Sequence, residues 1–240
     1  MDKNVLLVAI RAALQAGARI MDVYTDPNAD FEIEKKADNS PLTIADRKAH
    51  EVIASTLSVT PYPILSEEGK KIPVEERQSW NELWIVDPLD GTKEFIKRNG
   101  EFTVNIAYVK NGTPEAGVIY IPVKKELYFA DKEFGAYKVN EISSLAEDMT
   151  LDKLMAQGVE EMKQKHSRIE IASKGSSLKL CLIAEGKADV YPRFAPTMEW
   201  DTAAGHAIIR ATGKEVWQAD TRRPLQYNKT DLLNPWFIAE

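Results

Sequence analysis

Apolar residues recur at helical spacing in four segments of the chain, which predicts helices over residues 6–24, 43–57, 176–185 and 199–212. Between these segments, short apolar runs bounded by turn residues predict strands. The Asn111-Gly112 pair is typical of a hairpin turn between two of them, and residues 38–41 form another turn signal. The predicted strands cover residues 31–35, 61–66, 83–87, 103–109, 117–121, 126–130, 135–139, 168–172, 189–191 and 215–218.

The order of these elements predicts a layered α/β fold of the α+β kind. A run of strands comes first and alternating strands and helices follow it, which favours two sheets layered with helices. A polar, helix-prone crossover over residues 141–167 separates an N-terminal half, 1–140, from a C-terminal half, 141–240. We expect the functional site to lie between the halves, so that they form one catalytic unit.

Composition and charge exclude several classes of partner. With 31 basic and 37 acidic residues, the 240-residue chain has a net charge of −6, which argues against bulk binding of nucleic acid. No stretch approaches the roughly 20 apolar residues of a membrane span. The single cysteine, Cys181, cannot form an internal disulfide and suits a reducing compartment. These features predict a cytoplasmic protein, with peripheral association with the inner membrane left open.

The segment 83–92 carries the strongest chemical signal. Its apolar residues predict a buried strand that brings Asp87 and Asp90 to one place, with Pro88 ending the strand and a Gly-Thr pair opening a helix. Two carboxylates in this position repel each other, and a hard divalent cation between them is the simplest way to offset the repulsion. A tight Asp-Gly turn with Asp90 as a helix cap explains the same residues equally well.

Five carboxylates stand where a predicted element begins or ends, namely Asp46, Glu67, Asp87, Asp90 and Asp201. Any one of them alone is more often a helix cap or a surface charge. If all five converge, their repulsion requires cations, and magnesium takes oxygen ligands of this kind. The joint pattern favours two or three Mg²⁺ ions. A helix that begins at Thr92 would also present N–H groups to a phosphate, and the Thr92 hydroxyl could orient an attacking water.

Two cations in the second half suit a substrate with a second phosphate. Ser176 and Ser177 begin a predicted helix, and Lys179 and Arg193 add positive charge near an otherwise acidic centre. The alternative is a capped helix with a solvated lysine and a surface arginine, and the residues by themselves leave both interpretations open.

Several of these segments match known motifs. Asp87-Pro88-Leu89-Asp90-Gly91-Thr92, followed by Phe95, resembles the first signature of the inositol monophosphatase superfamily, and Trp200-Asp201-Thr202-Ala203-Ala204-Gly205 resembles the second. Thr43-Ile44-Ala45-Asp46 and Glu67-Glu68 complete the set in the expected order. The resemblance implies a layered αβαβα sandwich of the sugar-phosphatase type and lithium-sensitive, magnesium-dependent hydrolysis of phosphate monoesters. A homodimer is an expectation at the level of the family only.

Carried over position by position, the resemblance implies a role for each residue. Most of the implied metal ligands lie in the N-terminal half, and the complete set is Glu67, Asp87, the Leu89 carbonyl, Asp90 and Asp201. Asp46 with Thr92 would activate the attacking water, and Glu68 would support them without touching the metal. The implied substrate contacts are Glu67, Leu89, Asp90, Gly91, Thr92, Ser176, Lys179, Arg193 and Asp201.

Within the superfamily, Gly175-Ser176-Ser177-Leu178-Lys179 and Tyr191-Pro192-Arg193-Phe194 resemble the 3′(2′),5′-bisphosphate nucleotidases of the bacterial CysQ type. This implies removal of the 3′-phosphate of adenosine 3′,5′-bisphosphate, a by-product of sulfate assimilation, and extends to 3′-phosphoadenosine 5′-phosphosulfate. The usual Ala-Ser-Arg-Ser-His segment of that branch does not occur before Gly175, and His166 stands in a different setting. The departure concerns nucleotide contacts rather than metal chemistry.

Two other functions stay open at this point. One is a phosphatase of inositol or other sugar monophosphates within the same superfamily. The other is an inactive homologue that binds a nucleotide or metal without turnover.

Overall fold

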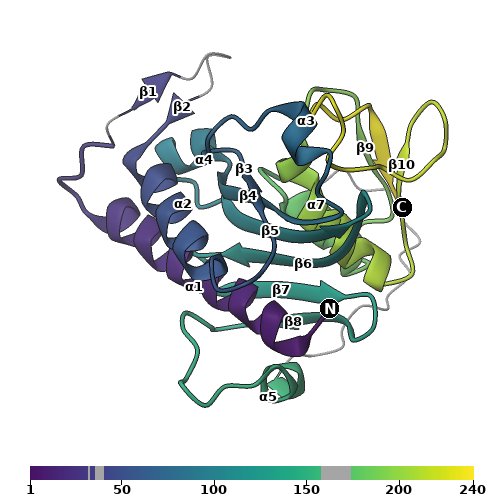
Figure 1. The fold of residues 1–240 in the computed structure, drawn as a ribbon. Coiled ribbons are helices and arrows are strands. Elements are labelled where there is room, and N and C mark those ends of the chain that lie inside the picture. The colour runs from purple at the N-terminus through teal and green to yellow at the C-terminus, as the bar shows by residue number, and fades with distance from the viewer. Residues whose placement is uncertain (32, 36–40, 158–173) are drawn as a thin grey trace.

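A six-stranded sheet forms the centre of the computed structural model, which describes residues 1–31, 33–35, 41–157 and 174–240 (Figure 1). The strand order is β3-β4-β5-β6-β7-β8, with β3 parallel to β4 and every other neighbouring pair antiparallel. The predicted hairpin is present, with Asn111 and Gly112 at φ of 49° and 74°. The strands are β3 (Ile64–Ser66), β4 (Glu82–Asp90), β5 (Thr103–Lys110), β6 (Thr113–Ile121), β7 (Glu126–Asp131) and β8 (Gly135–Val139).

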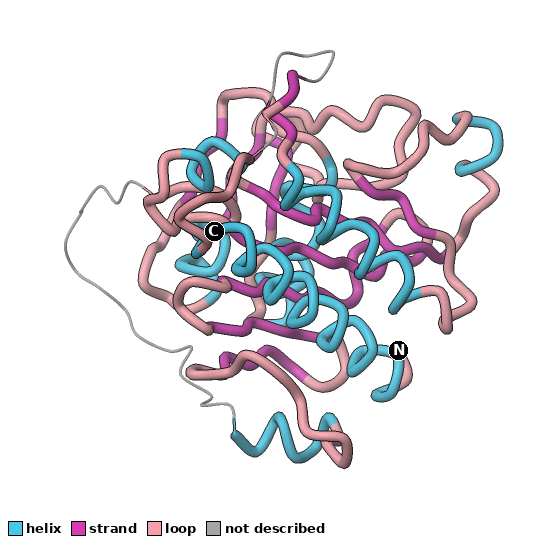
Figure 2. The backbone as a smooth tube through the Cα atoms, turned by 90° about the vertical axis from the view of Figure 1, so that its left-hand side faces the viewer, coloured by secondary structure: helices cyan, strands magenta, loops and turns pink. Residues whose placement is uncertain are grey.

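Side chains of this sheet alternate between two cores. In β4, Trp84 and Val86 belong to one buried cluster, whereas Leu83 and Ile85 belong to the other. The first core is covered by α1 (Lys3–Thr25) and α2 (Ile44–Leu57), which run side by side across that face (Figure 2). The second is covered by α6 (Leu178–Ala184), α7 (Glu199–Ala211) and a smaller sheet. The predicted layering of helices on a central sheet is therefore confirmed.

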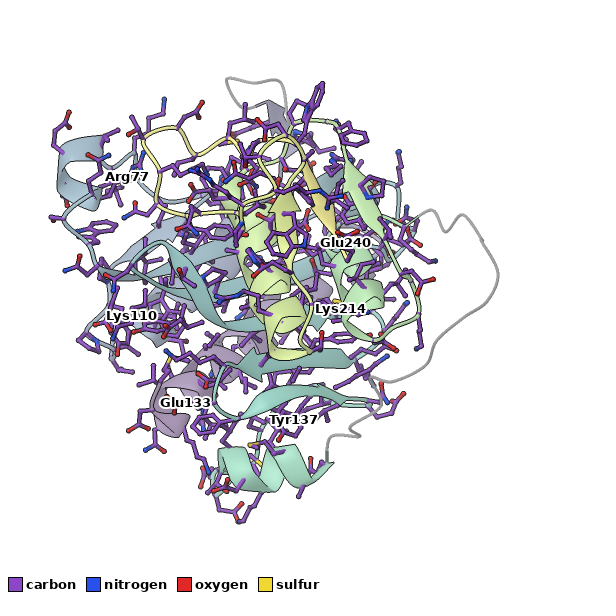
Figure 3. The ribbon with its side chains drawn as sticks, turned by 90° about the vertical axis from the view of Figure 1, so that its right-hand side faces the viewer. Arg77, Lys110, Glu133, Tyr137, Lys214 and Glu240 are labelled. Atoms are coloured by element: carbon purple, nitrogen blue, oxygen red, sulfur yellow. The ribbon has the colours of Figure 1, made fainter. Side chains whose placement is uncertain are left out.

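The smaller sheet has the order β10-β11-β9, from β9 (Tyr191–Arg193), β10 (Val216–Gln218) and β11 (Phe237–Ala239). Arg77, the last residue of α3 (Val74–Arg77), fixes the loop that leads to β11 (Figure 3). Its guanidinium donates to the carbonyls of Lys229 and Thr230, the latter at 2.6 Å. The other described elements are β1 (Glu34–Lys35), β2 (Pro41–Leu42), α4 (Thr92–Ile96) and α5 (Leu151–Gln157).

Helix α1 belongs to the protein core. It is the one helix among the described residues that is long and apolar enough to span a membrane by length and composition alone. Its apolar side chains, including Leu6, Ile10 and Ile20, are buried in the core shared with α2 and the sheet. Asp2 begins the helix by accepting a 2.7 Å hydrogen bond from the Asn4 N–H. The packing of α1 against α2 and the central sheet thus accounts for the apolar side chains of this helix.

The strand β4 continues past Pro88, so the prediction that the proline ends the strand is wrong. Its parallel neighbour β3 ends at Ser66, which pairs with Val86, so no ladder on that side requires the N–H that proline lacks. On the other side, the pairing with β5 shifts register between Asp87 and Asp90. An irregular strand end can accommodate a proline that a regular central ladder would exclude.

The four predicted helices are present as α1, α2, α6 and α7. Two strand predictions need correction: of the described residues within 31–35, only the two of β1 form a strand, and the strand predicted at 189–191 lies at 191–193. The short strands β2 and β11 were not predicted. Strand β11 is short, and no local sequence pattern indicates its pairing with β9 and β10. The predicted strand 168–172, residues 158–167 of the crossover with His166, and turn residues 38–40 lie outside the described residues.

Gly117 in β6 lets α7 approach the sheet closely, because a Cβ atom there would lie 2.3 Å from the Ala204 carbonyl oxygen. We expect Gly117→Ala to displace α7 and to lower the free energy of unfolding by about 3 kcal/mol. Urea denaturation measures that loss. Gly213→Ala is the control: it meets no atom within 4 Å but has φ of 82°, and should cost only about 1 kcal/mol. Equal losses of unfolding free energy in the two variants would contradict the importance of the close contact between Gly117 and α7.

Candidate metal centre and active site

Three carboxylates converge where the central sheet meets α7. Oxygens of Asp87, Asp90 and Asp201 lie within 4.8 Å of one another. Asp87 and Asp90 come from the end of β4, and Asp201 comes from the first turn of α7. The structure therefore brings together acids 111 residues apart in sequence, and these three are among the five that the sequence singled out.

The irregular end of β4 determines how its two acids are presented. Asp87 is 1% exposed, and its Oδ1 accepts a 3.0 Å hydrogen bond from the Leu89 N–H. This bond closes a tight bend around Pro88, so that Asp87 and Asp90 can both turn toward α7 despite the odd spacing between them. The bend is a local consequence of the sequence at the strand end.

Asp90 is held by two polar side chains: Asn105, which was not predicted to belong to the site, and Ser177, which the sequence placed only at a predicted helix start. Its Oδ2 accepts hydrogen bonds from the Ser177 hydroxyl at 2.8 Å and from the Asn105 amide at 3.3 Å. Asn105 also donates to Ser177 Oγ at 2.9 Å. The available signal for Asn105 was a polar side chain inside an otherwise apolar strand, β5.

Asp201 is fixed by the start of α7. Its Oδ2 accepts a 2.7 Å hydrogen bond from the Met198 N–H, which closes the first turn of the helix. Behind it, the Asn234 amide donates to the Met198 carbonyl at 2.8 Å and to Thr202 Oγ1 at 2.9 Å. The Tyr227 hydroxyl in turn contacts Thr202 at 3.3 Å. A buried polar network thus anchors the turn that carries Asp201.

Burial raises the pKa values of all three acids, and repulsion by neighbouring carboxylates adds to the shift for Asp87 and Asp201. For Asp87, burial is the largest cause of a pKa well above the usual range, and repulsion by Glu67, Asp90 and Asp201 adds to it. Burial and the neighbouring Asp90 raise the pKa of Asp201 to about 8. Burial also raises the pKa of Asp90, against the hydrogen bonds from Ser177 and Asn105. Three buried acids with raised pKa values bind protons, or a cation in their place, more strongly than exposed acids do.

Glu67 and Glu68 follow β3 in a turn beside this cluster. The Glu67 N–H donates to the Val86 carbonyl at 3.1 Å, and the Glu67 carboxylate is near enough to raise the pKa values of Asp87 and Asp201. Glu68 acts on a different neighbour, since its charge opposes the lowering of the His50 pKa by burial. The structure thus places the Glu67 carboxylate near Asp87 and Asp201, whereas Glu68, the next residue in the chain, interacts with His50.

Asp46 and Thr92 meet, as the motif comparison implied. The Thr92 hydroxyl donates to Asp46 Oδ1 at 3.1 Å and lies 3.3 Å from the Leu89 carbonyl oxygen. Asp46 Oδ2 accepts from the Thr43 N–H at 2.8 Å and from its hydroxyl at 2.5 Å. Thr43 caps α2, so the start of that helix holds the carboxylate in place.

Gly91 begins α4 in a conformation that favours glycine. Its φ is 93°, and a Cβ atom would lie 3.0 Å from the Glu101 carbonyl oxygen and 3.2 Å from Ser176 Cβ. The predicted helix start at Thr92 is present, and Gly91 lets the segment with Ser176 approach it. The Ser176 hydroxyl lies 3.3 Å from that of Thr103.

Lys179 and Arg193 lie on the side of the cluster formed by α6 and β9. The Lys179 ammonium donates to the carbonyls of Lys174 and Ser176 at 2.8 and 3.1 Å, and burial lowers its pKa while Asp90 opposes that shift. Arg193 Nε is buried and has no hydrogen-bond partner among the described residues. Ser177 makes no cap hydrogen bond, so the capped-helix part of the alternative interpretation does not fit.

Comparisons with known proteins agree with this arrangement. A model of the inositol monophosphatase family matches residues 1–236. The chain is 46% identical over 238 residues to the 3′(2′),5′-bisphosphate nucleotidase CysQ of Escherichia coli (strain K12), covering 94% of this chain and 95% of the relative. The corresponding protein of Haemophilus influenzae is 33% identical, with coverage of 99% and 93%.

Solved structures give the same result. The crystal structure of CysQ from Bacteroides thetaiotaomicron, described as a bacterial member of the inositol monophosphatase family, has a TM-score of 0.90 and 54% identity, covering 99% of this chain and 97% of that one. An inositol monophosphatase from Anabaena has a TM-score of 0.68 and 25% identity, covering 98% and 89%. The shared fold, the family match and the acids at the ends of β4 and α7 lead to one conclusion: the chain belongs to the inositol monophosphatase family and is a relative of its CysQ members.

Proposed function

We propose that the protein hydrolyses the 3′-phosphate of adenosine 3′,5′-bisphosphate to give AMP and phosphate, and acts likewise on 3′-phosphoadenosine 5′-phosphosulfate. Relatives at 46% identity are named 3′(2′),5′-bisphosphate nucleotidase. Most support comes from one observation in the structure, the buried group of Asp87, Asp90 and Asp201 beside the hydrogen-bonded pair of Asp46 and Thr92. The first group suits a cation, and the second suits proton transfer from water.

The acids fit magnesium as the cofactor, because the family is generally metal-dependent and the donors are carboxylate oxygens whose repulsion a divalent cation would offset. We propose two or three Mg²⁺ ions, held by Glu67, Asp87, the Leu89 carbonyl, Asp90 and Asp201. When bound, these ions would supply positive charge to the phosphoryl oxygens and make a water molecule more acidic. The N-terminal half, 1–140, would provide most of these ligands and the C-terminal half Asp201.

Asp46 and Thr92 are proposed to orient and deprotonate the attacking water. Because the Thr92 hydroxyl donates its hydrogen bond to Asp46 Oδ1, its oxygen is available to accept a hydrogen bond from water. The proton of that water can then pass toward the Asp46 carboxylate, which Thr43 holds through two further bonds. Water would attack phosphorus directly, without a covalent intermediate, while the bond from phosphorus to the ribose 3′-oxygen breaks and that oxygen takes up a proton from solvent. Glu68 would support this arrangement from the adjacent turn.

The second phosphate of the substrate is proposed to lie on the side of α6 and β9. Lys179 and Arg193 supply positive charge there, and the buried Nε of Arg193 is a hydrogen-bond donor that no described residue satisfies. Ser176 and Gly91 would complete the wall around the substrate, because their segments are in close contact. An inositol monophosphate has no second phosphate for these cations to bind.

The substrate assignment is tested by phosphate release from adenosine 3′,5′-bisphosphate and from inositol 1-phosphate, each with Mg²⁺ and with or without Li⁺. We expect a kcat/KM for the nucleotide at least about 100-fold higher, since losing one buried ionic contact costs about 3 kcal/mol, and inhibition by Li⁺. Preference for the inositol ester would overturn the substrate but keep the metal chemistry. Binding of the nucleotide without phosphate release would indicate an inactive homologue.

Substitution of Thr92 separates hydroxyl chemistry from shape. Thr92→Val keeps the size of the side chain but removes the bond to Asp46, and we expect kcat to fall by about 10²- to 10⁴-fold because the proton relay is lost. Thr92→Ser keeps the hydroxyl and should retain most of the wild-type rate. Steady-state kinetics at saturating Mg²⁺ make the comparison, and similar rates for the two variants would exclude the role of the hydroxyl.

The raised pKa values predict that the metal-free protein loses stability as pH rises. In the folded state Asp201 has a pKa of about 8, above its unfolded value of about 3.9, so the folded protein binds protons more tightly. The contribution of Asp201 to the free energy of unfolding is fully present below its pKa in the unfolded state, and it is lost as the pH rises through its pKa in the folded state. One such group changes the free energy of unfolding by up to about 1.4 kcal/mol per pH unit.

Urea denaturation in EDTA between pH 5 and pH 8 measures this slope. We expect the unfolding midpoint to fall with pH, the slope to be smaller in Asp201→Asn, and Mg²⁺ to stabilise the protein most at the alkaline end. Asp152→Asn, at an exposed acid paired with Lys3, is the matched control and should keep the wild-type slope. A midpoint independent of pH in EDTA would contradict the electrostatic description of the cluster.

A further inference from the structure

The Ser177 hydroxyl lies between the two elements of the acid cluster, and its single proton is shared between an acceptor on each of them. Its hydroxyl oxygen lies 2.8 Å from Asp90 Oδ2, at the end of β4, and 2.9 Å from the Asp201 carbonyl oxygen, in the first turn of α7. Ser177 is 3% exposed. A buried hydroxyl in this position connects the two elements that supply the acids, although it belongs to neither.

Asn105 completes the arrangement from β5. Its amide nitrogen donates to Ser177 Oγ at 2.9 Å and lies 3.3 Å from Asp90 Oδ2, and its Oδ1 accepts a 2.9 Å hydrogen bond from the Thr103 hydroxyl. Asn105 is 1% exposed, so these bonds are shielded from bulk solvent. The Thr103 bond fixes which end of the amide faces the cluster, because only the nitrogen can donate.

The hydrogen bonds distinguish the two oxygens of Asp90. Oδ2 has two donors, Ser177 and Asn105, and both come from side chains that are themselves buried. A carboxylate oxygen with two such donors has little remaining capacity, whereas Oδ1 has none of these donors. These two side chains therefore occupy one oxygen of Asp90 and leave the other without a side-chain donor, at a residue whose carboxylate lies within 4.8 Å of those of Asp87 and Asp201.

We propose that Asn105 and Ser177 are positioning residues of the metal centre: they bind Asp90 Oδ2, leave Oδ1 for a divalent cation, and hold Asp90 at a fixed place relative to the first turn of α7. This inference rests on the metal dependence proposed above, but not on the identity of the substrate. Neither residue needs to touch the cation or the phosphate ester. Their effect is to align a ligand before the cation arrives.

The test is the Mg²⁺ concentration that gives half of the maximal rise in melting temperature, measured without substrate. We expect this concentration to increase about 10- to 100-fold in Ser177→Ala and in Asn105→Ala. Because both residues act on the same oxygen, the double variant should be little worse than the single ones, and the double-mutant cycle should show strong coupling. In activity assays, the Mg²⁺ requirement should rise by the same factor as in the melting experiment.

Thr60→Ala provides the control for a merely structural loss. The Thr60 hydroxyl also makes two hydrogen bonds, donating to the Leu57 carbonyl at 2.7 Å and accepting from the Trp84 indole at 2.9 Å, near the other end of β4. It should lower the melting temperature in EDTA and leave the Mg²⁺ concentration unchanged. If Ser177→Ala behaves in the same way, or if Mg²⁺ does not stabilise the wild type, the positioning role is overturned.

Because the melting experiment contains no nucleotide, its result is distinct from that of the substrate assay. A rise in the required Mg²⁺ in both variants, together with preference for inositol 1-phosphate, would support the positioning role and overturn only the proposed substrate. Normal Mg²⁺ binding by the variants, together with preference for the nucleotide, would overturn the positioning role and support the proposed substrate.

Discussion

Repulsion among Asp87, Asp90 and Asp201 is the interaction on which the rest of the site depends. Their oxygens lie within 4.8 Å of one another, and burial removes the water that would screen them. A fold can retain such a group only if rigid elements hold the acids and a proton or cation offsets their charge. The end of β4, whose Leu89 packs into the first core, and the first turn of α7, whose Trp200 packs against the second core, are the elements that do this.

The packing around α7 shows what the acid cluster requires of the fold. Gly117 allows the helix to lie close against β6, and Asn234 and Thr202 fix its first turn through buried hydrogen bonds. On the other side, Asn105 and Ser177 hold Asp90. None of these residues offers a charge of its own. They supply close contact and directed donors, and these keep acids from distant parts of the chain at a short separation.

The sequence predicts the acids better than the residues that hold them. Asp87 near the end of β4 and Asp201 at the start of α7 belong to elements whose apolar pattern is clear, so their convergence follows from the fold, and Asp46 at the start of α2 joins the site through Thr92. The bonds of Asn105 and Ser177 depend on which strands and helices become neighbours, and this is set by tertiary packing with no local pattern. The prediction that Pro88 ends the strand fails for the same reason, because whether a proline is tolerated there depends on where the neighbouring strand β3 ends.

Asp46 differs from Asp87 and Asp201 in the hydrogen-bond donors that surround its carboxylate. Asp46 receives hydrogen bonds from Thr43 and Thr92, so the protein itself supplies the donors of the carboxylate that we propose as the proton acceptor. Asp87 and Asp201 have one backbone donor each among the described contacts and face other acids. A cation that binds them stabilises the folded state as well as the reaction, because it offsets a repulsion that unfolding would also relieve. Folding and metal binding are therefore coupled through the same three side chains.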